Sequence, residues 1–500
     1  MRSSTSGNCS PRRRHAQRGA GLVALAAILS ACTAGPDFSP PAPPAVASYV
    51  AGGDGLDTTA QRIVAGRPIG EQWWRAFGSA PLDALMQTAF ADNRTLAAAR
   101  ASLAAAREQQ RAAAGALWPQ LSLGGTTGRQ KYGVSLFGPS HFVIPPFTYY
   151  TAGPQVSYVL DLAGAERRTV EQRRALAQLR SYELRAVRLA LAGNVLAQAL
   201  AIASANTQLQ VLDRIVANDR RNLALVDAAR AAGSAAITDV VSAQSQLAHD
   251  ATLLPPLQQQ RSVAAHALAV LAGAAPAQRP APDLRLTDWR LPAVLPLLLP
   301  SALLRARPDI LAAESALHAA SAAIGIATAG LYPQITLSAN TTQQALSPGN
   351  LFNGAANAWA MAAGLTAPLF DGGTLRARRR AAIDLYRASL SDYRQTVLES
   401  FAQVADVLRA LQHDDAEIRA ERNAGKTAGH ALALMRISYR DGATGVLNVL
   451  DAERQYNQAR LQLVRAQARR FQDTALLYLA LGGGSAAAAA PAKPAAAAAP

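Results

Sequence analysis

Apolar residues recur every three or four positions along several stretches of the chain, the spacing of helices that pack on one side. Residues 82–116 keep this spacing and predict a helix that ends before Pro119. Two longer stretches, 165–231 and 375–440, place apolar residues in alternating steps of three and four, as heptads do. Each predicts a helix of about 100 Å, because the rise is 1.5 Å per residue. Helices of this length do not fit inside one compact globular core.

The period changes to two in four short segments, which we expect to be β-strands. One face of each segment is apolar and the other is small or polar, the pattern of transmembrane strands. An amphipathic sheet in a soluble sandwich gives the same alternation, although two hairpins about 200 residues apart make a poor sandwich. The strands are expected at about 119–128, 149–161, 333–343 and 357–369.

Each long helix is followed by a glycine loop and a helix that runs back. The loops contain Gly233 and Gly442. Two prolines at 255–256 divide the first return helix into the pieces 237–253 and 256–272, because proline is tolerated only at a helix start. The second return helix, 446–480, is uninterrupted. The sequence therefore predicts two helical hairpins.

The two halves of the chain repeat one another, which indicates a duplicated architecture. A first repeat is assigned to residues 70–283 and a second to 284–484, and their helical hairpins cover about 165–272 and 375–481. The register between the copies stays between 209 and 214 residues. Three pairs of segments match: 117–123 with 331–337, Gly233 with Gly442, and 271–273 with 481–483.

The N-terminal residues have the features of a bacterial lipoprotein signal. Residues 1–31 combine a basic start with an apolar core that is too short for a spanning helix. The segment ends before Cys32, which we expect to carry a covalent lipid such as palmitate; a chance cysteine after an ordinary signal is the alternative. Thr33 in place of aspartate indicates sorting to the outer membrane. Residues 32–69 form a proline-rich spacer, and 485–500 an Ala/Pro tail that cannot build a core.

Composition excludes several classes of function. The formal net charge is +16, but only three residues are lysine and the arginines are scattered along predicted helices, so a nucleic-acid partner is not expected. Cys9 precedes the expected cleavage point, which leaves no disulfide and no cysteine metal site. No arrangement of residues indicates catalysis or a resident metal, and no cofactor other than the lipid is expected.

Four transmembrane strands are too few to close a barrel within one chain. Every backbone amide in lipid needs a partner, and known single-chain barrels have about eight strands or more. Copies of the chain must therefore share one barrel, whose number of strands is a multiple of four. We predict a mixed α and β membrane protein in which long helices continue the barrel as a hollow cylinder.

The chain resembles the outer-membrane factors of tripartite efflux systems, TolC-like proteins, and among them the OprM/NodT-type lipoproteins. The resemblance spans residues 32–484 and rests on segments that are weak singly and specific in their order. These are 35–38 after Cys32, Trp73 and Trp74 with Phe77, 303–310, 368–373, 449–452 and 480–483.

The resemblance implies a homotrimer with a shared 12-stranded barrel and a periplasmic α-barrel of twelve helices. It implies a passive exit duct for drugs or other small toxic molecules and no enzymatic activity. The implied partners are outer-membrane lipid, a periplasmic adaptor (membrane fusion protein) and an inner-membrane RND-type transporter. A non-channel, periplasm-spanning structural lipoprotein, a type I secretion duct and a metal-ion efflux duct remain alternatives.

The resemblance also implies a gate at the hairpin tips, beside the loops of Gly233 and Gly442. Relatives join an aspartate of the first tip to a tyrosine of the second, which correspond here to Asp239, next to Thr238, and Tyr439. A hydrophobic constriction and an acidic ring correspond to Leu447 and Asp451. Asp239 is equally placed to cap the returning helix, and the two roles are compatible.

Overall fold

The computed structural model describes residues 33–51, 53–55, 61–132 and 145–484. The predicted signal segment, Cys32 and the tail after residue 484 lie outside the described residues. The chain divides into two compact units. The sheet unit comprises the residues up to Pro40, Ala104–Leu179 and Glu314–Asp392, and the helical unit comprises Pro41–Leu103, Arg180–Ala313 and the residues from Tyr393 onward.

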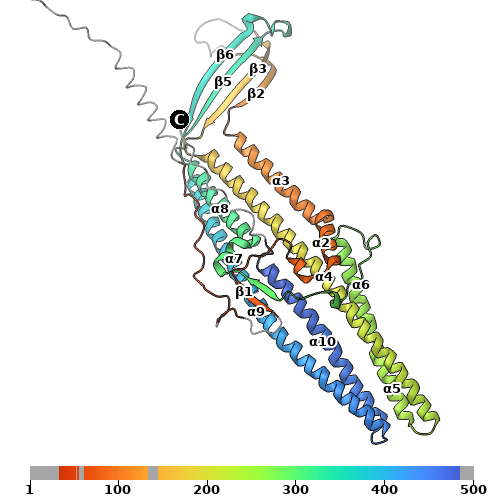
Figure 1. Cartoon of the computed structure of the whole chain (residues 1–500). Coiled ribbons are helices and arrows are strands. Elements are labelled where there is room, and N and C mark those ends of the chain that lie inside the picture. The colour runs from red at the N-terminus through yellow and green to blue at the C-terminus, as the bar shows by residue number, and fades with distance from the viewer. Residues whose placement is uncertain (1–32, 52, 56–60, 133–144, 485–500) are drawn as a thin grey trace, which may run out of the picture. The chain divides into compact units, whose positions relative to one another are not determined.

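The sheet unit contains one antiparallel sheet of four strands, in the order β2-β3-β5-β6 (Figure 1). The fourth strand was expected to reach residue 369 but ends at Thr366. Its partner strand begins at Gln334, which pairs with Thr366, so the ladder offers no partner further on. The strands are β2 (Gln120–Gln130), β3 (Phe147–Leu160), β5 (Gln334–Ala345) and β6 (Asn357–Thr366).

Two helices of 67 residues follow the two strand pairs, α4 (Ala165–Ala231) and α9 (Thr374–Arg440), within one residue of the predicted bounds. Each begins in the sheet unit and continues into the helical unit. The return helix of the first hairpin is divided into α5 (Ile237–Ala251) and α6 (Leu254–Leu271), with prolines in the first turn of α6. The second return helix is α10 (Val446–Ala480).

The single helix expected over 82–116 is two helices, α2 (Ala80–Asp92) and α3 (Arg94–Gly115). The apolar spacing continues through the break, but Asn93 has an extended backbone there and caps the next helix. Its Oδ1 accepts a hydrogen bond from the Leu96 amide at 2.9 Å, and its Nδ2 donates to the Leu271 carbonyl at 2.9 Å. A side chain that satisfies free amides at a helix start favours a new helix over a continuous one.

Aromatic residues before α2 build the core of the helical unit. Trp73, Trp74 and Phe77 are almost fully buried. Trp73 stacks on Tyr478 of α10 with ring centroids 5.4 Å apart, so the N-terminal segment is fixed to the end of the second hairpin. A short parallel pair, β1 (Arg62–Ala65) with β4 (Val294–Leu297), covers the same core and was not predicted, because four-residue strands carry little periodicity.

The segments 303–310 and 480–483, noted separately in the sequence, meet in the helical unit at Arg307. This residue lies between α7 (Pro300–Ala306) and α8 (Pro308–Ala329) and is 7% exposed. Its guanidinium donates to the Ala480 carbonyl at 2.8 Å and to Asp309 at 2.6 Å. Gly482 passes so close that an added Cβ would lie 2.6 Å from the Ala306 carbonyl oxygen. The close contact between the two segments therefore explains why each needs its arginine or glycine.

Candidate functional site

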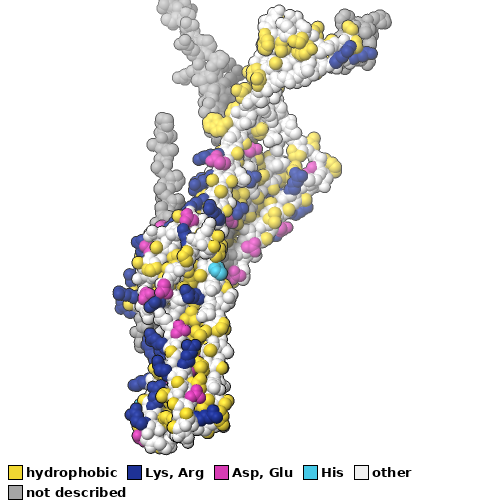
Figure 2. Space-filling view, turned by 90° about the vertical axis from the view of Figure 1, so that its right-hand side faces the viewer, with side chains coloured by type: hydrophobic (Ala, Val, Ile, Leu, Met, Phe, Trp, Pro, Cys, Tyr) yellow, Lys and Arg dark blue, Asp and Glu magenta, His cyan; other side chains and the backbone are white. Residues whose placement is uncertain are grey.

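The strand register gives the four-stranded sheet one apolar face. Leu121, Val156, Ala339 and Met361 form one row across all four strands, and the rows beside it have the same character. Most of the large side chains on this face are exposed in the single chain, for example Leu123 at 81% and Met361 at 78%. Figure 2 shows hydrophobic side chains on the surface of the sheet. A face of this size needs a cover, because soluble monomers rarely expose contiguous apolar patches this large.

The opposite face is polar but carries no charge at any paired position. Most of its side chains are amides, hydroxyls and small residues, which suits contact with water, and Phe147, Tyr149 and Val159 are the larger ones. The others include Gln120, Ser122, Thr126, Thr151, Gln155, Ser157, Gln334, Thr336, Ser338, Asn340, Thr342, Ala360, Ala362 and Gly364. The sheet therefore has two faces suited to different media, and the alternation read from the sequence is correct in all four strands.

Two edges of this sheet have no partner strand among the described residues of the chain. β2 pairs only with β3, and β6 pairs only with β5. An unpaired edge exposes backbone donors and acceptors and is a template for another strand. In lipid each such group costs several kcal/mol. The sheet is thus incomplete in a membrane unless other strands cover both edges.

Two aspartates, not predicted as functional, fix the long helices to the strands. Asp161 follows β3 and accepts hydrogen bonds from the Glu166 and Arg167 amides at 3.1 and 2.9 Å. Asp371 follows β6, 210 residues later, and accepts from the Gly373 and Leu375 amides at 2.9 and 2.7 Å. Those backbone donors hold the pKa of Asp371 below its usual value. The repeat of an aspartate and a glycine after each strand pair is the sequence signal that indicates these caps.

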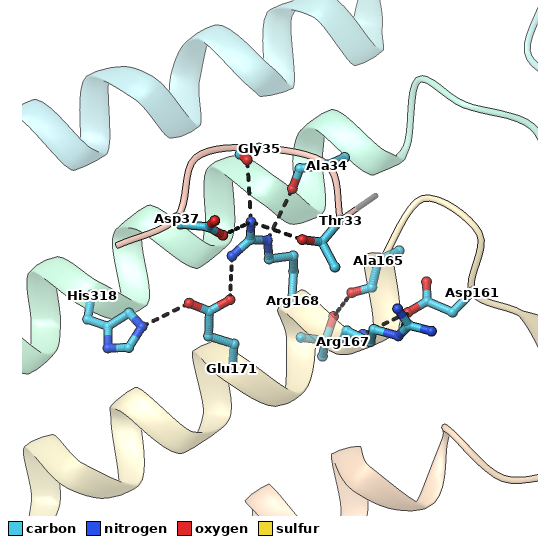
Figure 3. Close-up of polar contacts among 11 residues, drawn as sticks. Thr33, Ala34, Gly35, Asp37, Asp161, Ala165, Arg167, Arg168, Glu171 and His318 are labelled. Carbon is cyan, nitrogen blue, oxygen red and sulfur yellow. Dashed lines mark hydrogen bonds and ion pairs between the residues drawn. The ribbon is translucent and has the colours of Figure 1, made fainter. Parts of the chain in front are cut away.

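Arg168, at the start of α4, binds the segment that directly follows Cys32 (Figure 3). Its guanidinium is 5% exposed and donates to Asp37 at 2.8 Å, to the Ala34 and Gly35 carbonyls at 3.1 and 3.3 Å, and to Glu171 at 2.7 Å. Residues 33–38, the N-terminal strap, are therefore held by one buried cation.

The other contacts of the N-terminal strap also lie in the sheet unit. The amide of Ala34 donates to the Ala163 carbonyl at 2.9 Å, at the junction of β3 and α4. Phe38 stacks on His318, with ring centroids 4.3 Å apart, and His318 contacts Glu171. Gly35 has φ of +90°, and a Cβ there would lie 2.5 Å from the Cα of Gly325 in α8. Glycine at these positions permits the strap to lie directly on the helix.

The residues predicted to form a gate lie at the ends of the two helical hairpins. Gly233 and Gly442 have φ of +77° and +76°, as the turns at the helix ends require. Thr238 and Asp239 are in the first turn of α5, and Tyr439 is the penultimate residue of α9. Tyr439 is 42% exposed, so its hydroxyl is accessible to another group.

Asp239 caps its own helix in the single chain. Its Oδ2 accepts a hydrogen bond from the Ala236 amide at 3.0 Å. Within the described part of the chain, no hydrogen bond joins Asp239 to Tyr439. The capping role is present, and the gate role stays a prediction that concerns the assembled protein.

Leu447 and Asp451, on α10, line a groove that the second tip forms with α5 of the first hairpin. Asp451 pairs with Arg454 one turn further on and accepts from Gln455 at 2.8 Å. The acidic position is therefore partly neutralised by its own helix. The structure brings these two residues beside the first hairpin, whereas their expected roles as constriction and acidic ring require copies of the chain.

Comparison with known proteins supports the same interpretation of the sheet and hairpins. The family model described as "Outer membrane efflux protein" matches residues 85–274 and 299–483. The pyoverdine export outer membrane protein OpmQ of Pseudomonas putida is 31% identical over 83% of this chain and 88% of its own. The antibiotic efflux pump outer membrane protein ArpC of Pseudomonas putida is 30% identical over 92% and 94%.

A third relative has also been solved as a structure. The cation efflux system protein CusC of Escherichia coli is 28% identical over 92% of this chain and 97% of its own. A solved CusC chain, 26% identical, matches 90% of this chain and 100% of its own with a TM-score of 0.79. The chain belongs to the outer membrane efflux protein family, and it is an outer-membrane duct of a tripartite efflux system.

Proposed function

We propose that three copies of the chain close one 12-stranded barrel in the outer membrane, with β2 of each copy paired to β6 of the next. The observation that carries this proposal is the four-stranded sheet with one apolar face, one uncharged polar face and two unpaired edges. Pairing the edges satisfies the backbone, and closure turns the apolar faces to lipid and the polar faces to a water-filled lumen. The copy number of three is that of the family that the chain resembles.

We infer that the helical hairpins of the three copies continue this lumen into the periplasm as an α-barrel. The length of α4 and α9, 67 residues each, supports this inference because about 100 Å of helix reaches far beyond a bilayer. At their far end the duct meets a periplasmic adaptor and an RND-type inner-membrane transporter, which supplies the energy.

The lipid on Cys32 anchors each copy. The N-terminal strap supports this part of the proposal, because Arg168 and the β3–α4 junction hold the first residues after the cysteine at the end of a strand. An acyl chain attached there enters the same membrane leaflet as that end of the barrel. The lipid and the barrel then insert together.

The proposed cargo is drugs or other small toxic molecules, delivered by the transporter. Relatives with the same architecture are named for pyoverdine, antibiotics and cations. A barrel lumen without charged side chains at the paired strand positions suits such breadth, since this part of the duct makes no strong demand on the charge of what passes. Selection of cargo is therefore assigned to the transporter.

Conductance in planar bilayers tests this function, and gate variants sharpen the test. The purified protein is expected to give small conductance steps, and Tyr439→Phe to give larger ones. The variant removes a hydroxyl that hydrogen-bonds Asp239 in the closed assembly, a bond to a charged group of about 1.5–3 kcal/mol. Asp239→Ala is expected to have the same effect, and it also removes the hydrogen bond that Asp239 accepts from the Ala236 amide at the start of α5. Unchanged conductance in both variants rules out the bond, and absence of any conductance rules out the duct.

A further inference from the structure

In each helical hairpin, among the described residues, an aspartate of the long helix faces an aspartate of the return helix. Asp219 of α4 pairs with Asp250 of α5, and Asp414 of α9 pairs with Asp473 of α10. Within each pair, the two residues lie almost equally far from the hairpin turn, which places them level in an antiparallel arrangement. The pairs are not at equivalent positions of the sequence repeat, so the duplication does not explain them.

Burial favours the protonated form of Asp219. Asp219 is 3% exposed and Asp250 is 8% exposed. Two carboxyl groups can hydrogen-bond only if one of them keeps its proton, and ionising both would place like charges together away from water. Burial, and then the neighbouring carboxylates of Asp250 and Glu453, raise the pKa of Asp219 to about 7. The Oδ2 atom of Asp219 has no hydrogen-bond partner.

The surroundings connect this pair to the second hairpin. Glu453 of α10 is 3% exposed, and it accepts from Asn222 of α4 at 2.7 Å and from Arg436 of α9 at 3.2 Å. Asp250 accepts from Gln246 of its own helix at 2.7 Å. Two carboxylates, those of Asp250 and Glu453, therefore face Asp219 from the neighbouring helices. The half-exposed cation Arg436 pairs with Glu453 and offsets the charge of that residue only.

The second pair differs in its neighbours. Two arginines, Arg470 and Arg469, offset the negative charge near Asp414, whose pKa burial and Asp473 nevertheless raise to about 7. This pair joins two helices of one hairpin and does not involve the other hairpin. Ionisation of Asp414 therefore causes charge repulsion within one hairpin. Ionisation of Asp219 also causes repulsion between α4 and Glu453 of the other hairpin.

We propose that Asp219, Asp250 and Glu453 form a pH-sensitive latch between the two helical hairpins, closed while Asp219 keeps its proton. When Asp219 ionises, three carboxylates share one buried site and the first hairpin separates from α10. Because the cluster lies a few helical turns from the tips, the periplasmic end of the duct opens more readily at neutral pH than in acid. This consequence rests on the proposed function.

The direction in which pH changes the stability of the latched state follows from thermodynamic linkage. A carboxyl whose pKa is raised in the latched state adds stability to that state at low pH and loses it as the pH rises through the raised value. The ratio of latched to unlatched hairpins is expected to fall by up to about tenfold per pH unit between roughly pH 4 and pH 7, and then to level off.

Two measurements on the full-length protein in detergent or bilayers test the latch, each with Asp219→Asn and a matched control. The asparagine keeps the shape and still donates to Asp250, but it cannot ionise. Asp227→Asn, on the exposed side of the same helix, removes an identical charge away from the cluster. The readouts are planar-bilayer conductance at pH 5, 6, 7 and 8, and hydrogen–deuterium exchange of residues 212–256, corrected for intrinsic rates.

Wild type and Asp227→Asn are expected to show exchange and conductance that rise from pH 5 to 7 and then plateau, and Asp219→Asn to stay at the acid value throughout. If hydrogen exchange follows this pH dependence but no conductance is seen at any pH, the result supports the latch and contradicts the proposed duct. A wild type that does not respond to pH, or an Asp219→Asn protein that responds like wild type, overturns the latch.

Discussion

Met361→Arg is expected to abolish insertion of the assembled protein into the outer membrane. Met361 is at the centre of β6, on the apolar face, and 78% of it is exposed in the single chain. An arginine near the bilayer midplane of a barrel costs about 2–4 kcal/mol. Three copies carry the substitution at once, so the cost to the assembly is about 6–12 kcal/mol. The measurement is the amount of protein that floats with outer membranes in a density gradient.

Ala360→Arg is the matched control, one residue earlier on the same strand. Its side chain lies on the polar face, in the row of Asn340 and Gln155. The same added charge then faces water, so membrane insertion is expected to remain near the wild-type level. Loss of insertion in the control with normal insertion of Met361→Arg would mean that the two faces are assigned the wrong way round.

Arg470→Ala is expected to destabilise the helical unit by several kcal/mol, because each buried group left without its hydrogen-bond partner costs about 1–3 kcal/mol. Arg470 is 1% exposed. Its Nε donates to Gln61 at 2.8 Å, and its Nη1 donates to the Leu411 carbonyl. The variant leaves Asp414 and Asp473 without their nearest buried cation. Thermal unfolding followed by helical circular dichroism measures the loss.

Arg469→Ala is the matched control, because it removes the same charge from an exposed position. Arg469 is the adjacent residue, its side chain is 52% exposed, and it pairs with Glu417 at the surface. Exposed pairs contribute about 0–1 kcal/mol, so the midpoint is expected to move little. Equal decreases in the unfolding midpoint of the two variants would show that the buried hydrogen bonds of Arg470 contribute no more to stability than an exposed ion pair.

Periodicity predicted most of the fold because it depends on nearest neighbours in the chain. The alternation in β2 and β6 and the heptad steps in α4 and α9 are local patterns with strong physical causes. The break at Asn93 was missed because a cap depends on one side chain, and the apolar spacing on either side continues in phase. The end of β6 was missed because it depends on where β5 begins.

The buried arginines were beyond prediction for a different reason. The partner of Arg168 at Asp37 lies 131 positions away, and that of Arg470 at Gln61 lies 409 away. Nothing near either arginine distinguishes it from the solvated arginines on the same helices. The aspartates that cap α4 and α9 were detectable, since each follows a strand pair and precedes a glycine within three residues. The gate residues remain predictions, because their roles belong to the assembly.

Cysteine cross-linking across the sheet edges tests directly whether three copies form a ring closed through β2 and β6. One chain carries a cysteine at Ser122 of β2 and a second at Ala360, Ala362 or Gly364 of β6 in turn, all on the polar face. Only side chains whose Cβ atoms come within about 3.5–4.5 Å form a disulfide. If three copies form a closed ring, one position yields cross-linked dimers and trimers beside the single chain, and nothing larger. No product at any position, or a ladder that continues past three, would contradict this closed ring.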